Sequence, residues 1–117
     1  MMNEHERLVR RLAKPGQDIA DEMTARSAHL LHMVLGLSSE AGELTDAIKR
    51  HVVYGQPLDT ANVVEELGDI EFYLAGLRDE LRLDREAILK HNIAKLNQRY
   101  TAGIFTAEEA KARADKA

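Results

Sequence analysis

Apolar residues recur at steps of three and four through the middle of the chain, which is the period of an amphipathic helix. The first stripe predicts a helix that begins between Asp18 and Ser27 and ends near Tyr54. Gly55 and Pro57 follow it directly, and both residue types stop helices. The stripe consists of Leu30, Met33, Val34, Leu37, Ala41, Leu44 and Ile48.

A second apolar stripe predicts a helix over residues 60–81, with Asp59 or Thr60 as its N-cap. Its members are Val63, Leu67, Ile70, Leu74, Leu77 and Leu81. Only a short connection separates the two predicted helices, and connections of this length fold neighbouring helices antiparallel. We therefore expect a central antiparallel helix pair.

Shorter helices are predicted on both sides of this pair. Residues 4–14 form one, closed by Pro15 and Gly16, and Asp84 is a plausible N-cap for another that ends near Tyr100. The string Thr-Ala-Glu-Glu that begins at Thr106 has the form of a capping box, ahead of a short Ala-rich helix over about 106–116. No segment alternates as a strand does.

The composition agrees with this pattern. The chain has 117 residues, the length of one ordinary domain, and no internal stretch rich in Pro, Gly or Ser divides it. Only three Tyr and two Phe occur, and helix-forming residue types dominate. We predict one all-α domain over residues 1–117, a bundle of four to five helices whose core spans about residues 27–100.

Composition also excludes several kinds of partner. No apolar run approaches the roughly 20 residues that span a bilayer, and the N-terminus lacks the apolar segment of a signal peptide, so we expect a cytoplasmic protein without a membrane partner. The net charge of −4 argues against a nucleic-acid partner. Because the chain has no Cys, carboxylates and five His remain as possible metal ligands.

Two pairs of acidic residues flank the apolar stripes. Glu40 and Glu43 lie about 60° apart on the first predicted helix, and Glu66 and Asp69 lie about 60° apart on the second. Each pair has the same offset from its stripe, in the same rotational sense. In an antiparallel helix pair these equal offsets place all four carboxylates on one side of the seam.

Four converging carboxylates repel one another, so a cation is expected between them. Oxygen ligands without Cys or His suit Mg²⁺, with Mn²⁺ as a possible substitute. The alternative interpretation is a solvated acidic face, because 20 acidic residues in a helical chain often fall three apart. Downstream, Asn92, Lys95 and Arg99 share one helical face, which is either a solvated basic face or a grip for a polyphosphate.

Two other metal sites are rejected. His29 and His32 are three residues apart, as metal ligands often are, but no third ligand accompanies them. A di-iron carboxylate site calls for Glu-x-x-His on two helices, and no Glu in the chain is followed three residues later by His.

Three strings resemble the MazG-like, all-α nucleoside triphosphate pyrophosphohydrolases, a superfamily that also includes dimeric dUTPases and phosphoribosyl-ATP pyrophosphohydrolases. They are GLSSEAGELTDAIKR, NVVEELGDIEFYLAGL and NIAKLNQRYTAGIFTAEEA, and the resemblance covers about residues 30–109. Its core is Glu-x-x-Glu followed at a distance by Glu-x-x-Asp. Here Glu40, Glu43, Glu66 and Asp69 fill that pattern with 22 residues between the pairs.

The resemblance implies Mg²⁺-dependent hydrolysis of a nucleoside triphosphate, usually a deoxynucleotide, to the monophosphate and pyrophosphate, for control of the nucleotide pool. The four carboxylates would hold Mg²⁺ while water attacks the α-phosphorus. Lys95 and Arg99 would grip the departing phosphates, and Asn92 would contact sugar or phosphate. His29, Met33 and Tyr73 are candidates for the base pocket, although such residues more often belong to a core.

The resemblance leaves the general base open between two residues. Glu43 is the first candidate because it lies furthest from the apolar stripe, and Glu65 is the alternative. Ser39 precedes Glu40, so a base that relatives place there is absent here. The resemblance further implies assembly of the chain with itself, as a homodimer or homotetramer.

Two alternatives to a general nucleoside triphosphate pyrophosphohydrolase stay open. One is a narrow-specificity enzyme that resembles the dUTPases or the phosphoribosyl-ATP pyrophosphohydrolases. The other is a helical module that binds nucleotides or dimerises without turnover.

Overall fold

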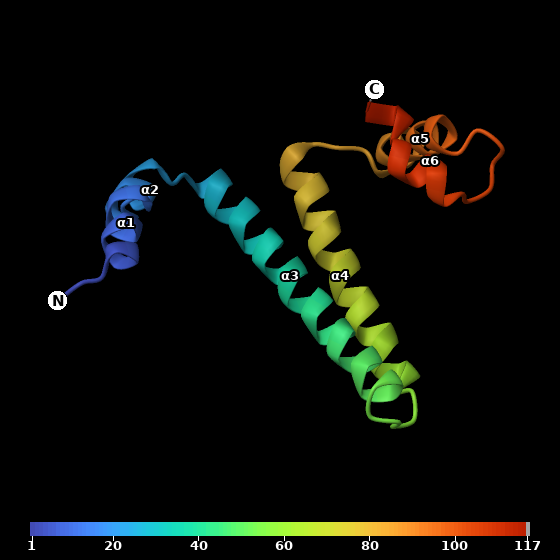
Figure 1. Cartoon of the computed structure of the whole chain (residues 1–117), viewed down its shortest axis with the longest axis horizontal. Coiled ribbons are helices and arrows are strands. Elements are labelled where there is room, and N and C mark those ends of the chain that lie inside the picture. The colour runs from blue at the N-terminus through green and yellow to red at the C-terminus, as the bar shows by residue number, and fades with distance from the viewer. Residues whose placement is uncertain (117) are drawn as a thin grey trace.

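The computed structural model describes residues 1–116, and this part of the chain is helical without strands. The all-α class predicted from the sequence is therefore confirmed. In chain order the helices are α1 (Glu4–Leu12), α2 (Gly16–Glu22), α3 (Ala25–Val52), α4 (Thr60–Leu81), α5 (Arg85–Arg99), α6 (Ala107–Ala112) and the short 3₁₀ helix η1 (Ala114–Lys116) (Figure 1).

Among the described helices, none combines the length and the apolar composition that a membrane-spanning helix needs.

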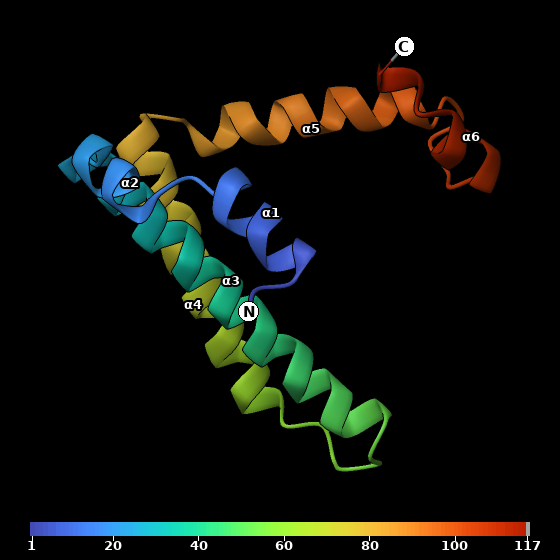
Figure 2. The ribbon, with the colours of Figure 1, turned by 60° about the vertical axis from the view of Figure 1, so that its left-hand side comes forward.

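The two longest helices, α3 and α4, form the antiparallel hairpin that the sequence predicts (Figures 1 and 2). Helix α4 spans the predicted residues 60–81. It begins at Thr60 because the side chain of Asp59 accepts a hydrogen bond of 3.0 Å from the backbone N–H of Asn62. The loop that joins the helices lies at one end of the hairpin, and we call this end the turn end. Helices α2 and α5 join the hairpin at its other end, the open end.

The segment before the hairpin differs in detail from the prediction. The first helix ends at Leu12 rather than at residue 14, and a separate helix, α2, follows it. Met23 and Thr24 then adopt extended backbone conformations, so α2 does not continue into α3. The long helix begins at Ala25 because Thr24 and Ser27 cap it reciprocally, with hydrogen bonds of 3.1 and 2.8 Å.

The C-terminal helix is also shorter than predicted. Thr106 caps α6 as expected, through a hydrogen bond of 3.1 Å from the backbone N–H of Glu109. The helix ends at Ala112 because Arg113 adopts a left-handed conformation with φ of 48°, a common way to end a helix. Residues 114–116 then form the separate 3₁₀ helix η1.

Two glycines accept large side chains across the seam between α3 and α4, and both lie in the half of the hairpin nearer its open end. The Tyr73 side chain lies so close to Gly36 that a Cβ at that position would overlap its ring. Met33 is buried and occupies the matching space above Gly76. Each glycine therefore accepts a large side chain from the opposite helix, which explains its presence inside a helix despite its low helix propensity.

The rest of the chain spreads away from the hairpin, as Figure 2 shows for α5. The radius of gyration is 20.2 Å, against about 13 Å for a compact domain of this length. The accessible surface is 9436 Å², against about 6,400 Å² for a compact chain of this mass. Beyond the hairpin, the main packing is that of α6 and η1 against α5.

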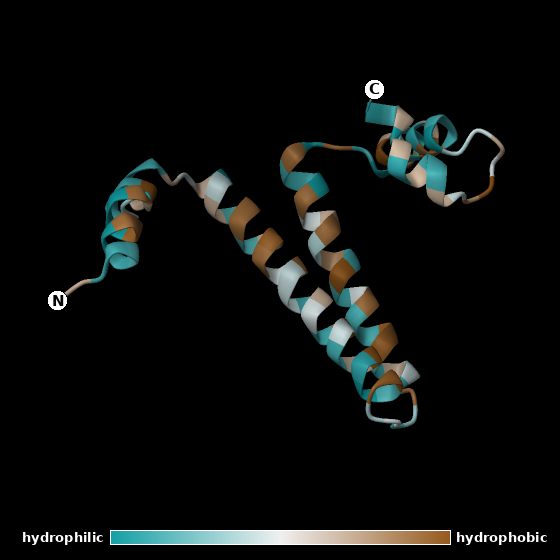
Figure 3. Ribbon diagram, viewed as in Figure 1, coloured by the Kyte–Doolittle hydropathy of each residue, from teal (hydrophilic) through white to brown (hydrophobic). Residues whose placement is uncertain are grey.

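Much apolar surface is consequently uncovered. Figure 3 marks the apolar residues along the hairpin in brown. Among the described residues only Met33 and Ala47 are buried apolar side chains. The exposed apolar residues of α3 and α4 include Leu31, Val34, Leu35, Ile48, Val64, Leu67 and Phe72. A core this small is well below what a chain of this length normally buries.

Candidate metal centre

Three carboxylates from the two central helices meet in the hairpin. Glu40 and Glu43 come from α3 and Glu66 comes from α4, and one ligand oxygen of each lies within 4.8 Å of the others. We call these three residues the carboxylate cluster. Glu66 is 6% exposed, Glu40 is half-buried, and Glu43 is exposed. The cluster thus runs from the interior of the hairpin to its surface.

The electrostatics of the carboxylate cluster are unfavourable without a cation. The pKa of Glu66 is raised from 4.5 to about 7, first by the hydrogen bond that its protonated form makes with Glu40, then by burial and by the nearby Glu43. The Oε2 atoms of Glu40 and Glu66 are buried and lack a hydrogen-bond partner in the described part of the chain. Buried acceptors without a partner are rare in proteins, and where they occur a bound ion can satisfy them.

The residues of the carboxylate cluster fit a hard divalent cation. All their donor atoms are carboxylate oxygens, which Mg²⁺ and Mn²⁺ prefer, and their charges together outweigh that of one such ion. A cation among them would satisfy both unpartnered oxygens and offset the repulsion that raises the pKa of Glu66. The exposed side of Glu43 leaves room for water and substrate oxygens, which a catalytic Mg²⁺ site keeps.

Asp69, the fourth predicted ligand, is exposed and lies outside the group of oxygens within 4.8 Å. It follows Glu66 by three residues and therefore lies about 60° further round α4. Glu66 points into the seam, whereas Asp69 lies beyond it. A ligand role for Asp69 stays a prediction.

A hollow of about 420 Å³ adjoins the carboxylate cluster. It is lined by Ser39, Gly42, Glu43, Asp46, Arg50, Asn62 and Glu66. Asp46, Arg50 and Asn62 were not predicted as site residues from the sequence. Their sequence spacing could have indicated these three residues. Asp46 and Arg50 follow Glu43 by three and seven residues, and Asn62 precedes Glu66 by four, which places them on the same helix faces as the two acids.

The three residues predicted for a base pocket lie nearer the open end of the hairpin than the carboxylate cluster. Met33 and Tyr73 fill the spaces above the two packed glycines. His29 pairs with Glu80, with 3.2 Å between His29 Nδ1 and Glu80 Oε2. Since His29 precedes Glu40 by 11 residues, it lies about 16 Å away along α3. Their contact with a base stays a prediction.

The three polar residues predicted to hold phosphates lie on α5, which leaves the open end of the hairpin (Figures 1 and 2). The structure does not bring Asn92, Lys95 or Arg99 to the carboxylate cluster of the same chain: α5 begins after Leu81, about 22 Å along α4 from Glu66.

Arg99 is moreover paired within its own part of the chain. Its Nε and Nη2 atoms donate to the two carboxylate oxygens of Asp115 at 2.9 and 3.3 Å. This fork-like pairing raises the pKa of Arg99 and lowers the pKa of Asp115. Its phosphate role stays a prediction, and so do those of Asn92 and Lys95.

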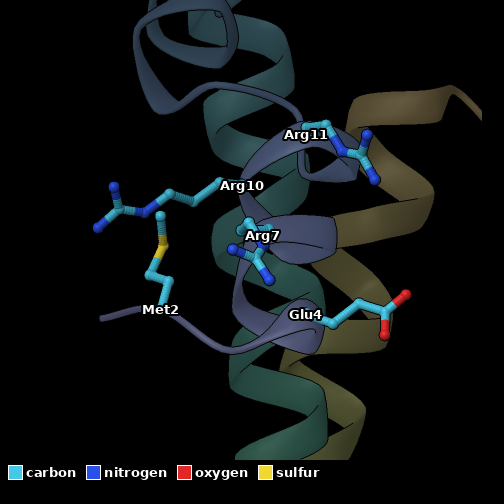
Figure 4. A pocket seen from close by; sticks show the side chains of 5 residues that line it. All are labelled: Met2, Glu4, Arg7, Arg10 and Arg11. Atoms are coloured by element: carbon cyan, nitrogen blue, oxygen red, sulfur yellow. The ribbon is translucent and has the colours of Figure 1, made fainter.

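A second hollow lies at α1, apart from the carboxylate cluster. Its volume is about 450 Å³, and it is lined by Met2, Glu4, Arg7, Arg10 and Arg11 (Figure 4). The guanidinium groups of Arg7, Arg10 and Arg11 point in different directions in Figure 4 and do not converge on one point. We therefore place the chemistry at the carboxylate cluster.

All-α proteins that bind metal through carboxylates turn several of them toward one partly buried point between helices, and the α3–α4 hairpin has this arrangement. The family model of the MazG nucleotide pyrophosphohydrolase domain matches residues 28–103. This is more than half of the chain, so the protein belongs to the MazG family, a family of nucleotide pyrophosphohydrolases. No curated protein and no solved structure matches the chain. The matched region holds the whole carboxylate cluster.

Proposed function

We propose that the protein hydrolyses a nucleoside triphosphate, preferably a deoxynucleotide, to the monophosphate and pyrophosphate in a Mg²⁺-dependent reaction. The observation that carries the proposal is the carboxylate cluster, with two buried and unpartnered oxygens beside an open hollow. Membership of the MazG family supports the reaction type. The reaction would serve control of the nucleotide pool in the cytoplasm, with residues 1–117 acting as one domain.

In this proposal Glu40, Glu43 and Glu66 hold Mg²⁺, and Asp69 joins them when the site is loaded; Mn²⁺ is the substitute. Bound Mg²⁺ supplies neutralisation of phosphate charge and a lower pKa for water. Glu66 must be ionised to act as a ligand, so with a pKa of about 7 the fraction of Glu66 that is protonated at neutral pH, about half, gives up its proton when the cation arrives.

The exposed carboxylate of Glu43 faces the hollow and is the proposed general base. It accepts a proton from the water that attacks the α-phosphorus. The bond from the α-phosphorus to the oxygen that bridges it to the β-phosphorus then breaks, and pyrophosphate leaves with the bonding electrons. Glu65, which neighbours Glu66 on α4, is the alternative base.

We further propose that the chain assembles with itself as a homodimer or homotetramer. The support is the apolar surface of the hairpin, since a single copy buries only two apolar side chains among its described residues. A second copy would cover this surface. It would also offer its own α5 to the neighbouring carboxylate cluster, which is the arrangement in which Asn92, Lys95 and Arg99 reach phosphates and His29, Met33 and Tyr73 reach a base.

The first experiment is product analysis after incubation of the purified protein with each canonical and each deaminated nucleoside triphosphate, in both ribose and deoxyribose forms, and with phosphoribosyl-ATP. Phosphorus NMR and ion chromatography separate pyrophosphate from orthophosphate. We expect pyrophosphate and the monophosphate with Mg²⁺, and neither product with EDTA.

The substrate panel also separates the alternatives. Turnover of dUTP or phosphoribosyl-ATP alone would establish a narrow enzyme in place of a general one. Tight Mg²⁺-dependent nucleotide binding without any product would overturn the enzymatic proposal in favour of a binding module. Orthophosphate as the first product would place bond cleavage at the γ-phosphorus and contradict the proposed reaction.

A further inference from the structure

The lining of the hollow beside the carboxylate cluster includes a positively charged side chain, which cannot itself be a metal ligand. Arg50 lines the hollow together with Asp46, and its Nε lies 3.4 Å from Asp46 Oδ2. Both side chains are about half exposed, at 45% and 56%. An exposed pair of this kind contributes little to stability, so the interaction with Asp46 leaves the guanidinium free to take a stronger partner.

Arg50 and Asn62 lie at one end of the hollow, toward the turn end of the hairpin. On α3, Arg50 follows Glu43 by seven residues, about 10 Å along the helix axis. On α4, Asn62 precedes Glu66 by four residues, about 6 Å along the axis. Because the helices are antiparallel, both displacements point toward the turn, and the two side chains line the same hollow from opposite helices.

In the opposite direction along the hairpin, two large side chains pack against glycines across the seam. There Tyr73 packs over Gly36 and Met33 packs over Gly76. The donor side chains of Arg50 and Asn62 line the hollow on the turn side of Glu43 and Glu66. A ligand that carries negative charge along its length would extend from the cluster toward the turn.

We propose that Arg50 and Asn62 form the subsite for the terminal phosphates of the substrate, which become the departing pyrophosphate. The substrate would then lie with its phosphates toward the turn and its nucleoside toward the open end. The guanidinium of Arg50 donates two parallel hydrogen bonds to phosphate oxygens, and the carboxamide N–H groups of Asn62 donate from the other helix. This inference rests on the proposed function.

Asp46 also lines this subsite. Its carboxylate is a poor partner for phosphate because the charges repel, and its exposed pair with Arg50 is weak enough to be exchanged for a phosphate. Other cations of the same copy are less well placed. Arg99 is engaged with Asp115, and Lys49 lies 5.9 Å from the centre of the Tyr54 ring and does not line the hollow.

The test measures binding of inorganic pyrophosphate to the full chain by isothermal titration calorimetry in excess Mg²⁺. We expect Arg50→Met to weaken pyrophosphate binding by roughly 10- to 100-fold, the range for loss of charged hydrogen bonds. Arg50→Lys should recover part of the affinity, because it restores the charge but not the fork. Asn62→Ala should weaken binding by about 3- to 10-fold.

Lys49→Met is the matched control, since it removes one positive charge from the neighbouring position, which also faces Asp46, without altering the lining of the hollow. It should change pyrophosphate affinity by less than about twofold. A second readout is Mn²⁺ binding without pyrophosphate, followed by electron paramagnetic resonance. This affinity should be unchanged in Arg50→Met, because Arg50 does not contribute a ligand. Circular dichroism checks that each variant keeps its helices.

Several results would overturn the inference. They are an Arg50→Met protein that binds pyrophosphate like the wild type, an equal loss in Lys49→Met, and a wild type that does not bind pyrophosphate in Mg²⁺. None of these depends on turnover. If the wild type binds pyrophosphate through Arg50 but hydrolyses no nucleotide, the proposed reaction fails while the subsite stands, so the two failures are distinguishable.

Discussion

The two halves of the α3–α4 hairpin solve the problem of helix packing in opposite ways. Toward the open end, each helix presents a glycine to a large side chain of the other, Gly36 to Tyr73 and Gly76 to Met33. Toward the turn end, carboxylates lie at the seam beside the buried Ala47. There Glu66 is buried, and its Oε2 atom is unpartnered in the described chain.

This difference separates what the fold supplies by itself from what it leaves to a ligand. The open-end half closes its seam at the two glycines with van der Waals contacts. The turn-end half contains like charges, buried acceptors and a carboxyl group with a pKa of about 7, all of which disfavour the closed arrangement without a cation. The packed half can therefore hold the helices in register while the charged half keeps its carboxylates available for the proposed cation.

The largest expected effect is on catalytic activity, and it comes from a substitution in the charged, turn-end half of the hairpin. Glu43→Gln keeps the shape of the side chain but removes both the charge and the proton acceptor. We expect hydrolysis to fall by about 10²- to 10⁴-fold, the usual contribution of a general base. Initial rates of pyrophosphate release measure the loss, and circular dichroism should show unchanged helix content.

Glu71→Gln is the matched control for this substitution, because Glu71 is an exposed acid on α4 outside the carboxylate cluster. Its activity should stay within about twofold of the wild type. Glu65→Gln separates the two candidate bases. A large loss in Glu65→Gln together with near-normal activity in Glu43→Gln would reverse the assignment of the base.

The second largest effect is on the free energy of unfolding, which should depend on pH and on bound Mg²⁺. In EDTA the folded state keeps a proton on Glu66 up to about pH 7, whereas the unfolded chain releases it near 4.5. The folded state therefore binds more protons between these values, so its stability should fall as the pH rises from 5 to 7.5. Mg²⁺ at a hundred times its dissociation constant should add about 2.7 kcal/mol to the free energy of unfolding above pH 7, and less at pH 5.

Thermal unfolding at several pH values, with Mg²⁺ and with EDTA, measures both trends. Glu66→Gln cannot ionise at this position, so in EDTA it should be more stable than the wild type at pH 7.5 and should lose most of the pH dependence. A wild type that becomes more stable between pH 5 and 7.5 in EDTA would contradict the assigned environment of Glu66.

How far the sequence predicts the fold depends on whether the signal is local. The apolar stripe and the capping residue Asp59 predict the bounds of α4, because both act within one helix. The break before Ala25 was not predicted, since Met23 and Thr24 are extended and only the Thr24–Ser27 cap marks the start of α3. An apolar stripe shows which face of a helix is to be buried, but it does not show whether another helix of the chain or a second copy of the chain covers that face. The sequence therefore did not predict that α5 leaves the hairpin.

The candidate site was predictable to the same extent. Equal offsets beside two stripes placed Glu40, Glu43 and Glu66 together, and the structure brings them within 4.8 Å. The same offsets included Asp69, because a rotation of 60° looks small on a helical wheel. In the hairpin this rotation separates a buried side chain from an exposed one. Arg50 follows Glu43 by seven residues on the same helix face, but it was not predicted because its role also depends on the position of the turn, which offsets from a stripe do not encode.

The smallest expected effect tests the packed half of the hairpin through its glycines. In Gly36→Ala the new Cβ overlaps the Tyr73 ring, and overpacking of this kind destabilises by about 1–3 kcal/mol. The higher helix propensity of Ala offsets up to about 1 kcal/mol of that loss. We therefore expect a net decrease in the free energy of unfolding, measured by urea denaturation.

Gly68→Ala is the matched control, because no atom lies within 4 Å of a Cβ built at that position. Only the propensity term remains, so this variant should gain up to about 1 kcal/mol. The two substitutions should change the free energy of unfolding in opposite directions, although both replace a glycine inside the same hairpin by the same residue. If Gly36→Ala were as stable as Gly68→Ala, the close approach of Tyr73 would not hold the two helices together. The register of the carboxylate cluster would then have to come from the turn, from a second copy of the chain, or from the bound cation.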